Sequence, residues 1–255
     1  MIQNNFPITF VSEVVSGIFV TRFRAPEIAR AVKPGQFINI RVHNQTDPLL
    51  RRPFSVRRVV DDDVEIIFNV IGRGTSILAD KKAGEYLDVI GPLGNPFTID
   101  NIDGEVILLA GGMGVAPLPI LTEDLIKANI KLKTFIGART SDRLILDYLF
   151  HTRIATEDGS RDYNGTVIEL LKDYLENIKI LPKKIFACGP NQMIKSLSEL
   201  LENYNIQCEV SLESMMACGF GICQGCPVEL STGGEKFGLV CTDGPVFNIK
   251  SIKIK

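Results

Sequence analysis

Residues 6–97 form short apolar runs separated by turn residues such as Pro34-Gly35 and Gly91-Pro92. Runs of this length, bounded by Gly, Pro and Asp, predict β-strands. We expect a single short helix near Thr75–Lys82 and six strands: Ile8–Val15, Ile18–Phe23, Gln36–Val42, Phe54–Val60, Val64–Val70 and Tyr86–Ile90. Closing such strands into a small antiparallel barrel removes their exposed edges.

The pattern changes after Asp103-Gly104, where apolar runs alternate with stretches of helical period. The expected strands are Val106–Ala110, Lys133–Gly137, Lys184–Cys188 and Ile206–Leu212, and the expected helices are Val115–Ala128, Val167–Asn177 and Asn191–Asn203. This alternation predicts a parallel sheet, and an uninterrupted apolar run such as residues 106–110 suits a central strand covered on both faces.

Residues 213–255 are rich in Gly and Cys and have no helical period. A segment of this size does not build a core alone, so we expect a bound centre to organise it. The predicted fold class is therefore β barrel plus α/β: a barrel over residues 1–102, a parallel-sheet domain over 103–212 and a small module over 213–255.

Composition narrows the function. The chain has 255 residues, 45% of them hydrophobic, and a net charge of −2, so it lacks the basic footprint of a nucleic-acid-binding protein. We find no signal-peptide pattern at Met1–Phe10 and no apolar stretch of about 18 residues, and we expect a cytoplasmic protein that does not enter a membrane. His43 and His151, the only histidines, lie in no nucleophile or metal motif, which gives hydrolase chemistry no support.

Four of the six cysteines crowd into residues 218–241 with the spacing C-x4-C-x2-C-x14-C: Cys218, Cys223, Cys226 and Cys241. The first three match the plant-type [2Fe–2S] spacing, and interleaved glycines let backbone N–H groups approach the sulfurs. The alternative is a structural zinc site, which also accepts four thiolates. Zinc sites usually use paired C-x2-C knuckles, so the spacing favours the iron–sulfur cluster.

A second group of motifs suits a flavin dinucleotide. Arg52-Pro53-Phe54-Ser55 offers a guanidinium for a diphosphate and an aromatic ring for an isoalloxazine, and Gly74-Thr75 begins the expected helix, where free N–H groups face an anion. Each motif alone is more often a strand entry or a helix cap. Their weight comes from occurring together.

A third group suits a nicotinamide dinucleotide. Gly111, Gly112 and Gly114 follow the buried strand 106–110 and precede a helix near Pro117, which permits close approach of a pyrophosphate. Cys188, at the carboxyl end of a later strand, is the candidate catalytic residue beside the nicotinamide. The alternatives are a glycine turn without ligand and a buried cysteine that acts as a small hydrophobe.

Taken in order, the motifs at residues 52–55, 74–75, 111–117 and 188–190 resemble the ferredoxin–NADP reductase superfamily over residues 6–212. The C-terminal segment opens with Glu213-Ser214-Met215-Met216-Ala217-Cys218-Gly219 and closes with Val240-Cys241-Thr242-Asp243-Gly244-Pro245-Val246-Phe247. With it, nearly the whole chain is similar to the electron-transfer subunits of dihydroorotate dehydrogenase B.

The resemblance implies an oxidoreductase subunit of pyrimidine biosynthesis with FAD, a [2Fe–2S] cluster and NAD(H) as substrate. It also implies a separate FMN-containing catalytic subunit that oxidises dihydroorotate, in a heterotetramer with two copies of each chain. Family members often carry Arg where this chain has Asn69. The FAD contacts that it implies are Arg52, Pro53, Phe54, Ser55, Phe68, Asn69, Val70, Gly74 and Thr75.

Two rival functions remain open at this point. One is a stand-alone or bifurcating NAD(P)H:ferredoxin-type oxidoreductase, because such enzymes share the flavin and nicotinamide motifs. The other is a zinc-containing nucleotide sensor without turnover. Arg139 and Ser141, near the expected adenosine side, do not separate NAD from NADP.

Overall fold

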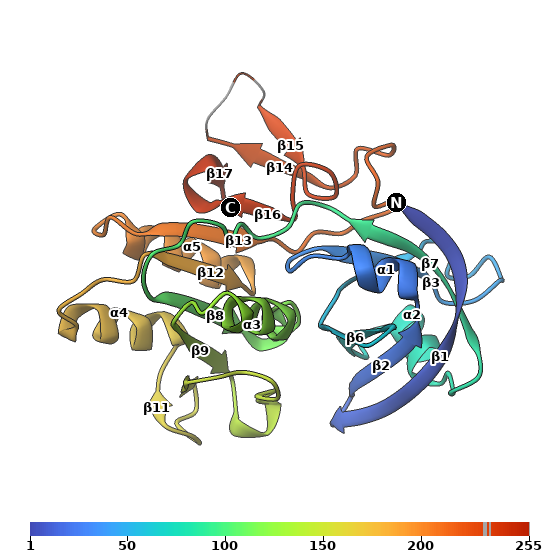
Figure 1. Ribbon diagram of the computed structural model, residues 1–255, viewed down its shortest axis with the longest axis horizontal. Helices are drawn as coiled ribbons and strands as arrows, with labels where there is room; N and C mark the ends of the chain where they lie inside the picture. Colours follow the sequence, from blue (N-terminus) through green and yellow to red (C-terminus); the bar gives the residue numbers. More distant parts are fainter. Residues whose placement is uncertain (232–233, 235, 255) are drawn as a thin grey trace.

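The computed structural model describes residues 1–231, 234 and 236–254. Figure 1 shows two sheet-based bodies side by side, with the C-terminal segment, drawn in red, lying across the top of both. The blue-to-cyan body is built from the N-terminal strands, and the green-to-orange body carries helices around a second sheet. The fold therefore brings the three parts of the sequence against one another.

The N-terminal body is a seven-stranded antiparallel sheet in the order β4-β3-β7-β1-β2-β6-β5. Its strands are β1 Ile2–Val15, β2 Ile18–Arg24, β3 Phe37–Arg41, β4 Arg52–Ser55, β5 Arg58–Val60, β6 Asp63–Asn69 and β7 Tyr86–Leu93. Strand β1 is long because it pairs first with β7 and then with β2. The expected barrel is confirmed.

The predicted single strand Phe54–Val60 is wrong, because the chain changes partners within it. The Val56 N–H donates to the Gln36 carbonyl at 3.2 Å, and the Arg57 N–H donates to the Glu65 carbonyl at 2.8 Å. Strands β4 and β5 consequently lie at opposite ends of the sheet order, and the two residues between them join those ends. This crossing closes the barrel.

The barrel also contains two short helices where a single one was expected. Helix α2, Arg73–Ala79, lies near the predicted position, whereas α1, Pro26–Ala31, was missed. Proline suits the first turn of α1, where its missing N–H leaves no hydrogen bond unmade. Ile28, the only buried residue of α1, packs into the barrel core with Phe23 and Ile38.

The second sheet has the order β11-β10-β9-β8-β12-β13-β16, parallel except for its last strand. Its strands are β8 Val106–Gly111, β9 Leu132–Ala138, β10 Thr152–Thr156, β11 Tyr163–Asn164, β12 Lys184–Cys188, β13 Gln207–Ser211 and β16 Val246–Asn248. Its helices are α3 Leu118–Lys127, α4 Val167–Asn177 and α5 Asn191–Leu201, with the 3-10 turns η1 Gly112–Val115 and η2 Ser141–Arg143. The parallel sheet is confirmed, whereas β10 and β11 were not expected.

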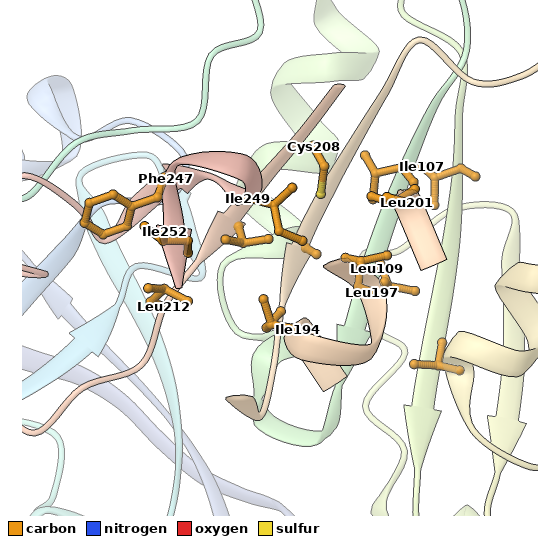
Figure 2. Close-up of a cluster of buried hydrophobic side chains, with 14 of the residues drawn as sticks. Ile107, Leu109, Ile194, Leu197, Leu201, Cys208, Leu212, Phe247, Ile249 and Ile252 are labelled. Atoms are coloured by element: carbon orange, nitrogen blue, oxygen red, sulfur yellow. The ribbon is translucent and has the colours of Figure 1, made fainter. Parts of the chain in front are cut away.

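Strand β8 shows why an unbroken apolar run marks a central strand. Its alternate side chains enter two different cores, so that Ile107 and Leu109 pack on one face of the sheet and Val106, Leu108 and Ala110 on the other. Figure 2 shows Ile107 and Leu109 facing residues of α5. Both faces of β8 are therefore dry, and only apolar residues fit them.

The described apolar residues of the C-terminal segment form no core of their own. The segment forms the small sheet β15-β14-β17, with strands β14 Pro227–Leu230, β15 Phe237–Leu239 and β17 Ile252–Lys253, and the 3-10 turn η3 Ile249–Ser251. Its strand β16 pairs with β13 of the larger sheet. Phe247, Ile249 and Ile252 enter the same buried cluster as α5 (Figure 2). The segment therefore depends on the α/β body for its apolar packing.

Among the described residues, no helix combines the length and the apolar character needed to cross a bilayer.

Candidate functional site

A cavity of about 720 Å³ lies where the barrel, the α/β body and the C-terminal segment meet. Strand β4 and the end of β6 supply one wall, and the start of α3 and the ends of β12 and β13 supply the other. The predicted site residues that line it are Arg52, Pro53, Phe54, Ser55, Phe68, Asn69, Thr75, Pro117 and Cys188. Residues predicted separately for a flavin and for a nicotinamide therefore face one cavity, whereas Gly74, Gly111, Gly112 and Gly114 do not line it.

The Arg52 side chain packs against Gly74 in the first turn of α2. A Cβ placed on Gly74 would lie 2.8 Å from Arg52 Nε, so no side chain fits there without moving the guanidinium. Arg52 Nη1 also donates to the Leu50 carbonyl at 2.5 Å. Arg52 lines the cavity, so its guanidinium gives the wall a positive charge, which suits an anionic ligand.

The Thr75 hydroxyl shapes the turn that leads into α2. Thr75 Oγ1 accepts hydrogen bonds from the Ile71 N–H at 3.0 Å and the Gly72 N–H at 3.2 Å, and it donates to the Gly72 carbonyl at 3.0 Å. These bonds fix the turn beside Arg52. Val70 lies just outside the cavity, and its N–H donates to the Gly17 carbonyl at 2.8 Å.

Aromatic rings form the barrel wall of the cavity. The Phe54 and Phe68 ring centroids lie 5.5 Å apart in a tilted arrangement, and Phe19 stacks behind Phe68 at 6.1 Å. Phe54 is 8% exposed and Phe68 is 3% exposed, so both rings are fixed by the core. The wall is apolar and rigid, as a planar ring system requires.

The glycines after β8 have different surroundings. A Cβ on Gly114 would meet the Cys188 carbonyl oxygen at 2.1 Å, and one on Gly111 would meet Met193 Sδ at 2.7 Å. Gly112 has a φ of +53°, and a Cβ placed on it would have nothing within 4 Å. Gly111 and Gly114 are therefore needed because they pack closely against α5 and the end of β12. Of the three glycines, only Gly112 leaves open space for a ligand.

Cys188 lies at the carboxyl end of β12 and is 3% exposed. Burial raises the pKa of its thiol well above the ordinary value, the nearby Glu213 carboxylate raises it further, and a hydrogen bond with Ser211 opposes the rise. The thiol is consequently neutral near pH 7. It can contact a ligand ring as a polarisable group, but it is not a thiolate nucleophile.

Glu213 is a cavity residue that sequence reasoning missed. It belongs to the exposed residues, yet desolvation of its carboxyl group among the cavity residues raises its pKa. The sequence did contain a signal for Glu213, because this residue follows the carboxyl end of strand β13. Open parallel sheets place their ligands at that end of the strands. Ser214, Met215 and Met216 continue along the cavity wall from there.

The four clustered cysteines converge in two pairs. Cys226 directly precedes β14, and Cys241 is the second residue after β15. The β14–β15 hairpin therefore brings both thiols to its base, where the Val240 N–H donates to the Cys226 carbonyl at 2.9 Å. Both thiols are buried. Burial, followed by the hydrogen bond and charge of Cys226, raises the pKa of Cys241 to about 12.

The other pair lies on a glycine-rich loop. Cys218 Sγ accepts from the Cys223 N–H at 3.4 Å, and Cys223 Sγ accepts from the Gly225 N–H at 3.4 Å. Partial burial raises the pKa of Cys218, but hydrogen bonds from the Phe220, Cys223 and Ile222 amides outweigh it and lower the pKa to about 7. Amides aimed at sulfur stabilise thiolate, the form that ligates metal.

The donor set fits a binuclear iron–sulfur cluster. Each iron of a [2Fe–2S] cluster takes two protein ligands, and this loop and hairpin offer two pairs of thiols with amide donors around them. Within the described part of the chain, no three His, Cys, Asp or Glu side chains converge as ligands of one metal ion.

Comparisons with known proteins agree with this architecture. Residues 213–253 match the family described as the iron-sulfur cluster binding domain of dihydroorotate dehydrogenase B. A protein of Desulforamulus reducens named "Dihydroorotate dehydrogenase B (NAD(+)), electron transfer subunit" is 37% identical over 242 residues, covering 92% of each chain. A protein of the same name from Enterococcus faecalis is 32% identical over 260 residues, covering 98% of each.

Solved structures give the same picture of the fold. The structure of an NADH-dependent reduced ferredoxin-NADP oxidoreductase, described for flavin-based electron bifurcation, matches with a TM-score of 0.87 at 28% identity and covers 98% of this chain and 90% of its own. Phthalate dioxygenase reductase matches with a TM-score of 0.66 at 14% identity, covering 91% of this chain and 87% of its own, and so supports the fold alone.

Full-length similarity above 30% identity, the matched cysteine domain and the shared fold lead to one conclusion. The chain belongs to the family of dihydroorotate dehydrogenase B electron transfer subunits, within the ferredoxin–NADP reductase fold.

Proposed function

We propose that this chain carries electrons from a separate, FMN-containing dihydroorotate-oxidising subunit to NAD⁺ in pyrimidine biosynthesis. One observation carries the proposal: the segment that lines the cavity runs directly into the cysteine loop. Leu212 to Met216 face the cavity, and Cys218 follows two residues later. A cavity for a dinucleotide cofactor and a four-thiol site are thus joined by a short stretch of chain.

FAD is the cofactor that the barrel side of the cavity suits. Arg52 would hold the diphosphate, Phe54 and Phe68 would flank the ring system, and Ser55, Pro53, Asn69, Val70, Gly74 and Thr75 would complete the contacts. When bound, FAD and a [2Fe–2S] cluster supply the conversion between two-electron hydride chemistry and one-electron transfer. The protein's task is to hold both groups in fixed positions and to keep water from the cavity.

The nicotinamide side is built from the α/β body. Gly112 offers open backbone near η1, with Pro117 at the start of α3, and Gly111 and Gly114 keep the turn tight. Cys188 would contact the nicotinamide as a neutral thiol, because burial disfavours the thiolate. Its proposed role is to shape and orient the ring position where hydride transfer occurs.

The cysteine loop is the surface on which the catalytic subunit would bind. Cys223 is exposed, and Ile222, the residue before it, is 77% exposed. Met215, at the cavity end of the same segment, is 91% exposed. The cysteine loop is therefore open to another protein, and its exposed apolar side chains suit such a contact. A catalytic subunit seated there would approach the cluster from the loop side, and we predict a heterotetramer with two copies of each chain in the cytoplasm.

The test is a reconstitution from two purified chains. This chain and a family catalytic subunit, mixed, should reduce NAD⁺ with dihydroorotate, whereas neither should do so alone. This chain alone should still oxidise NADH with an artificial electron acceptor. Dihydroorotate-dependent reduction of NAD⁺ by this chain unaided would refute the proposal.

The same mixture tests the rival function of a ferredoxin reductase. Rapid NADH-dependent reduction of purified ferredoxin, together with no activity in the presence of the catalytic subunit, would favour the rival. The relatives at 32–37% identity carry the dihydroorotate dehydrogenase name, and the bifurcating oxidoreductase matches at 28%. Sequence similarity therefore supports the dihydroorotate system.

A further inference from the structure

Two asparagines of the barrel body donate hydrogen bonds to the cysteine segment. One bonds at the first of the four cysteines in sequence and the other just after the last. Asn39, in the middle of β3, donates from Nδ2 to the Cys218 carbonyl at 2.8 Å. Asn95, just after β7, donates from Nδ2 to the Asp243 carbonyl at 2.9 Å. These are contacts across 179 and 148 residues of sequence, so they join separate parts of the fold.

Asn39 and Gly219 fit each other closely. Gly219 has φ of +78°, which favours glycine, and a Cβ placed there would lie 2.4 Å from Asn39 Nδ2. The residue after the first thiol must therefore be small for the amide to reach the Cys218 carbonyl. This contact fixes the start of the cysteine loop against the barrel.

Asn39 is also tied to the cavity wall. It pairs across the sheet with Pro53, and Phe37, two residues earlier on β3, lines the same cavity as Pro53. Asn39 is fully buried, and its Oδ1 finds no hydrogen-bond donor among the described residues. A buried amide that leaves its oxygen unpaired invites a functional explanation, and here the paired half holds Cys218.

The consequence for Cys218 follows from its own hydrogen bonds. Its Sγ accepts from the Cys223 N–H at 3.4 Å, a geometry that depends on where the loop begins. Hydrogen bonds to the sulfurs and exposure to solvent set the reduction potential of an iron–sulfur cluster. A residue that fixes the Cys218 carbonyl also fixes the sulfur beside it and the distance from that sulfur to the cavity.

We propose that Asn39 is a positioning residue that anchors the Cys218 loop to the cofactor barrel, setting the potential of the cluster and the rate at which electrons pass between cavity and cluster. Asn95 anchors the opposite side of the ligand set, next to Cys241. The proposal rests on the proposed function, because it assumes a flavin in the cavity and a cluster on the thiols.

The test compares Asn39→Leu, which keeps the size of the side chain and removes its amide, with a matched control. Thr21→Val is that control, because Thr21 is also fully buried in the barrel, has an unpaired Oγ1 and belongs to β2, away from the cysteine loop. Iron and FAD content, the electron paramagnetic resonance spectrum of the reduced cluster and its midpoint potential are measured on both full chains. Stopped-flow absorbance then separates flavin reduction by NADH from reduction of the cluster.

Asn39→Leu should keep FAD and the rate of flavin reduction, shift the spectrum and potential of the cluster, and slow its reduction about tenfold, as loss of groups that orient metal ligands typically does. Thr21→Val should match the wild type in every measurement. A cluster in Asn39→Leu with wild-type spectrum, potential and reduction rate would overturn the proposal. A wild-type chain without flavin or iron would instead overturn the proposed function on which it rests.

Gly219→Ala gives an independent second test if Asn39→Leu retains too little cluster to measure. The added Cβ must displace the Asn39 amide, so the spectrum and potential should shift in this variant as well. Gly234→Ala, in the same segment with no described atom within 4 Å of its Cβ position, is the matched control. A wild-type spectrum in Gly219→Ala would count against the anchor.

Discussion

The guanidinium of Arg57 and the carboxylate of Glu65 lie 2.7 Å apart where the barrel closes, and neither side chain is more than 3% exposed. The second Glu65 oxygen accepts from Arg22 Nε at 2.5 Å. The Arg57 carbonyl in turn accepts from the Ile120 N–H in α3 at 2.8 Å. One buried carboxylate thus stabilises the crossing between β4 and β5 and the seam with the α/β body.

Glu65→Gln should lower the free energy of unfolding by about 3–5 kcal/mol, because the buried Arg57 guanidinium then keeps only the exposed Asp147 carboxylate, 3.7 Å away, as a counter-ion. Denaturant unfolding of both FAD-loaded proteins measures the difference. Asp124→Asn is the control, since Asp124 pairs with Lys127 at the surface and such pairs contribute about 0–1 kcal/mol. A Glu65→Gln loss no larger than that of Asp124→Asn would contradict this account of the seam.

Arg52→Ala should weaken FAD retention, because the cavity loses the cation that faces the diphosphate. Gly74→Ala should weaken it too, since its Cβ would push into the guanidinium. We expect at least a tenfold higher dissociation constant in each case, about 1.4 kcal/mol, measured by fluorescence of released flavin. Gly72→Ala, with nothing within 4 Å of its Cβ position, should bind FAD normally. Equal retention in all three variants would remove Arg52 from the flavin site.

Cys223→Ser should separate the two half-reactions. Flavin reduction by NADH should persist nearly unchanged, while electron transfer with the catalytic subunit should be lost because the cluster loses a ligand. Cys208→Ala, which alters a buried cysteine in the core of the parallel sheet, should keep both activities. If Cys223→Ser lost flavin reduction as well, the cluster would be mainly structural.

Glu213 gives the chain a predictable pH dependence. Its pKa is raised in the folded protein, so its contribution to stability is fully present below the unfolded pKa and is lost as pH rises through the folded pKa. Glu213→Gln should therefore gain stability relative to wild type as pH rises from 4 to about 8, measured by denaturant unfolding at each pH. Ser214→Ala, the adjacent non-titrating change, should show a constant difference. If the stability of Glu213→Gln relative to wild type fell as pH rose, the pKa of Glu213 would be lowered rather than raised in the folded protein.

Local sequence signals predicted most of the fold. Helix α4 begins at Val167 and ends at Asn177, as the periodicity predicts, and β12 has the predicted bounds. The break at Val56 could not be foreseen, because residues 54–60 have the pattern of one continuous strand and the change of partner depends on barrel closure. Helix α1 is short and has one buried residue, which leaves almost no periodic signal.

The residues of the candidate site likewise fall into those that a local sequence pattern predicted and those that it did not. The cysteine spacing and the Arg52 motif are local patterns and were predicted from neighbouring residues. Asn39 reaches Cys218 across 179 residues and has no local signature, whereas Glu213 had a signal in its place after the carboxyl end of β13. The sequence assigned Gly114 to a ligand, whereas in the structure Gly114 is needed because a Cβ there would meet the Cys188 carbonyl oxygen.

The most direct test of the account is the cofactor content of the full chain, purified without oxygen. We predict one FAD and the two irons of a [2Fe–2S] cluster per chain, with yellow-brown absorbance that bleaches when NADH is added. A colourless chain that holds zinc, and that takes up neither iron nor flavin on reconstitution, would contradict the central claim.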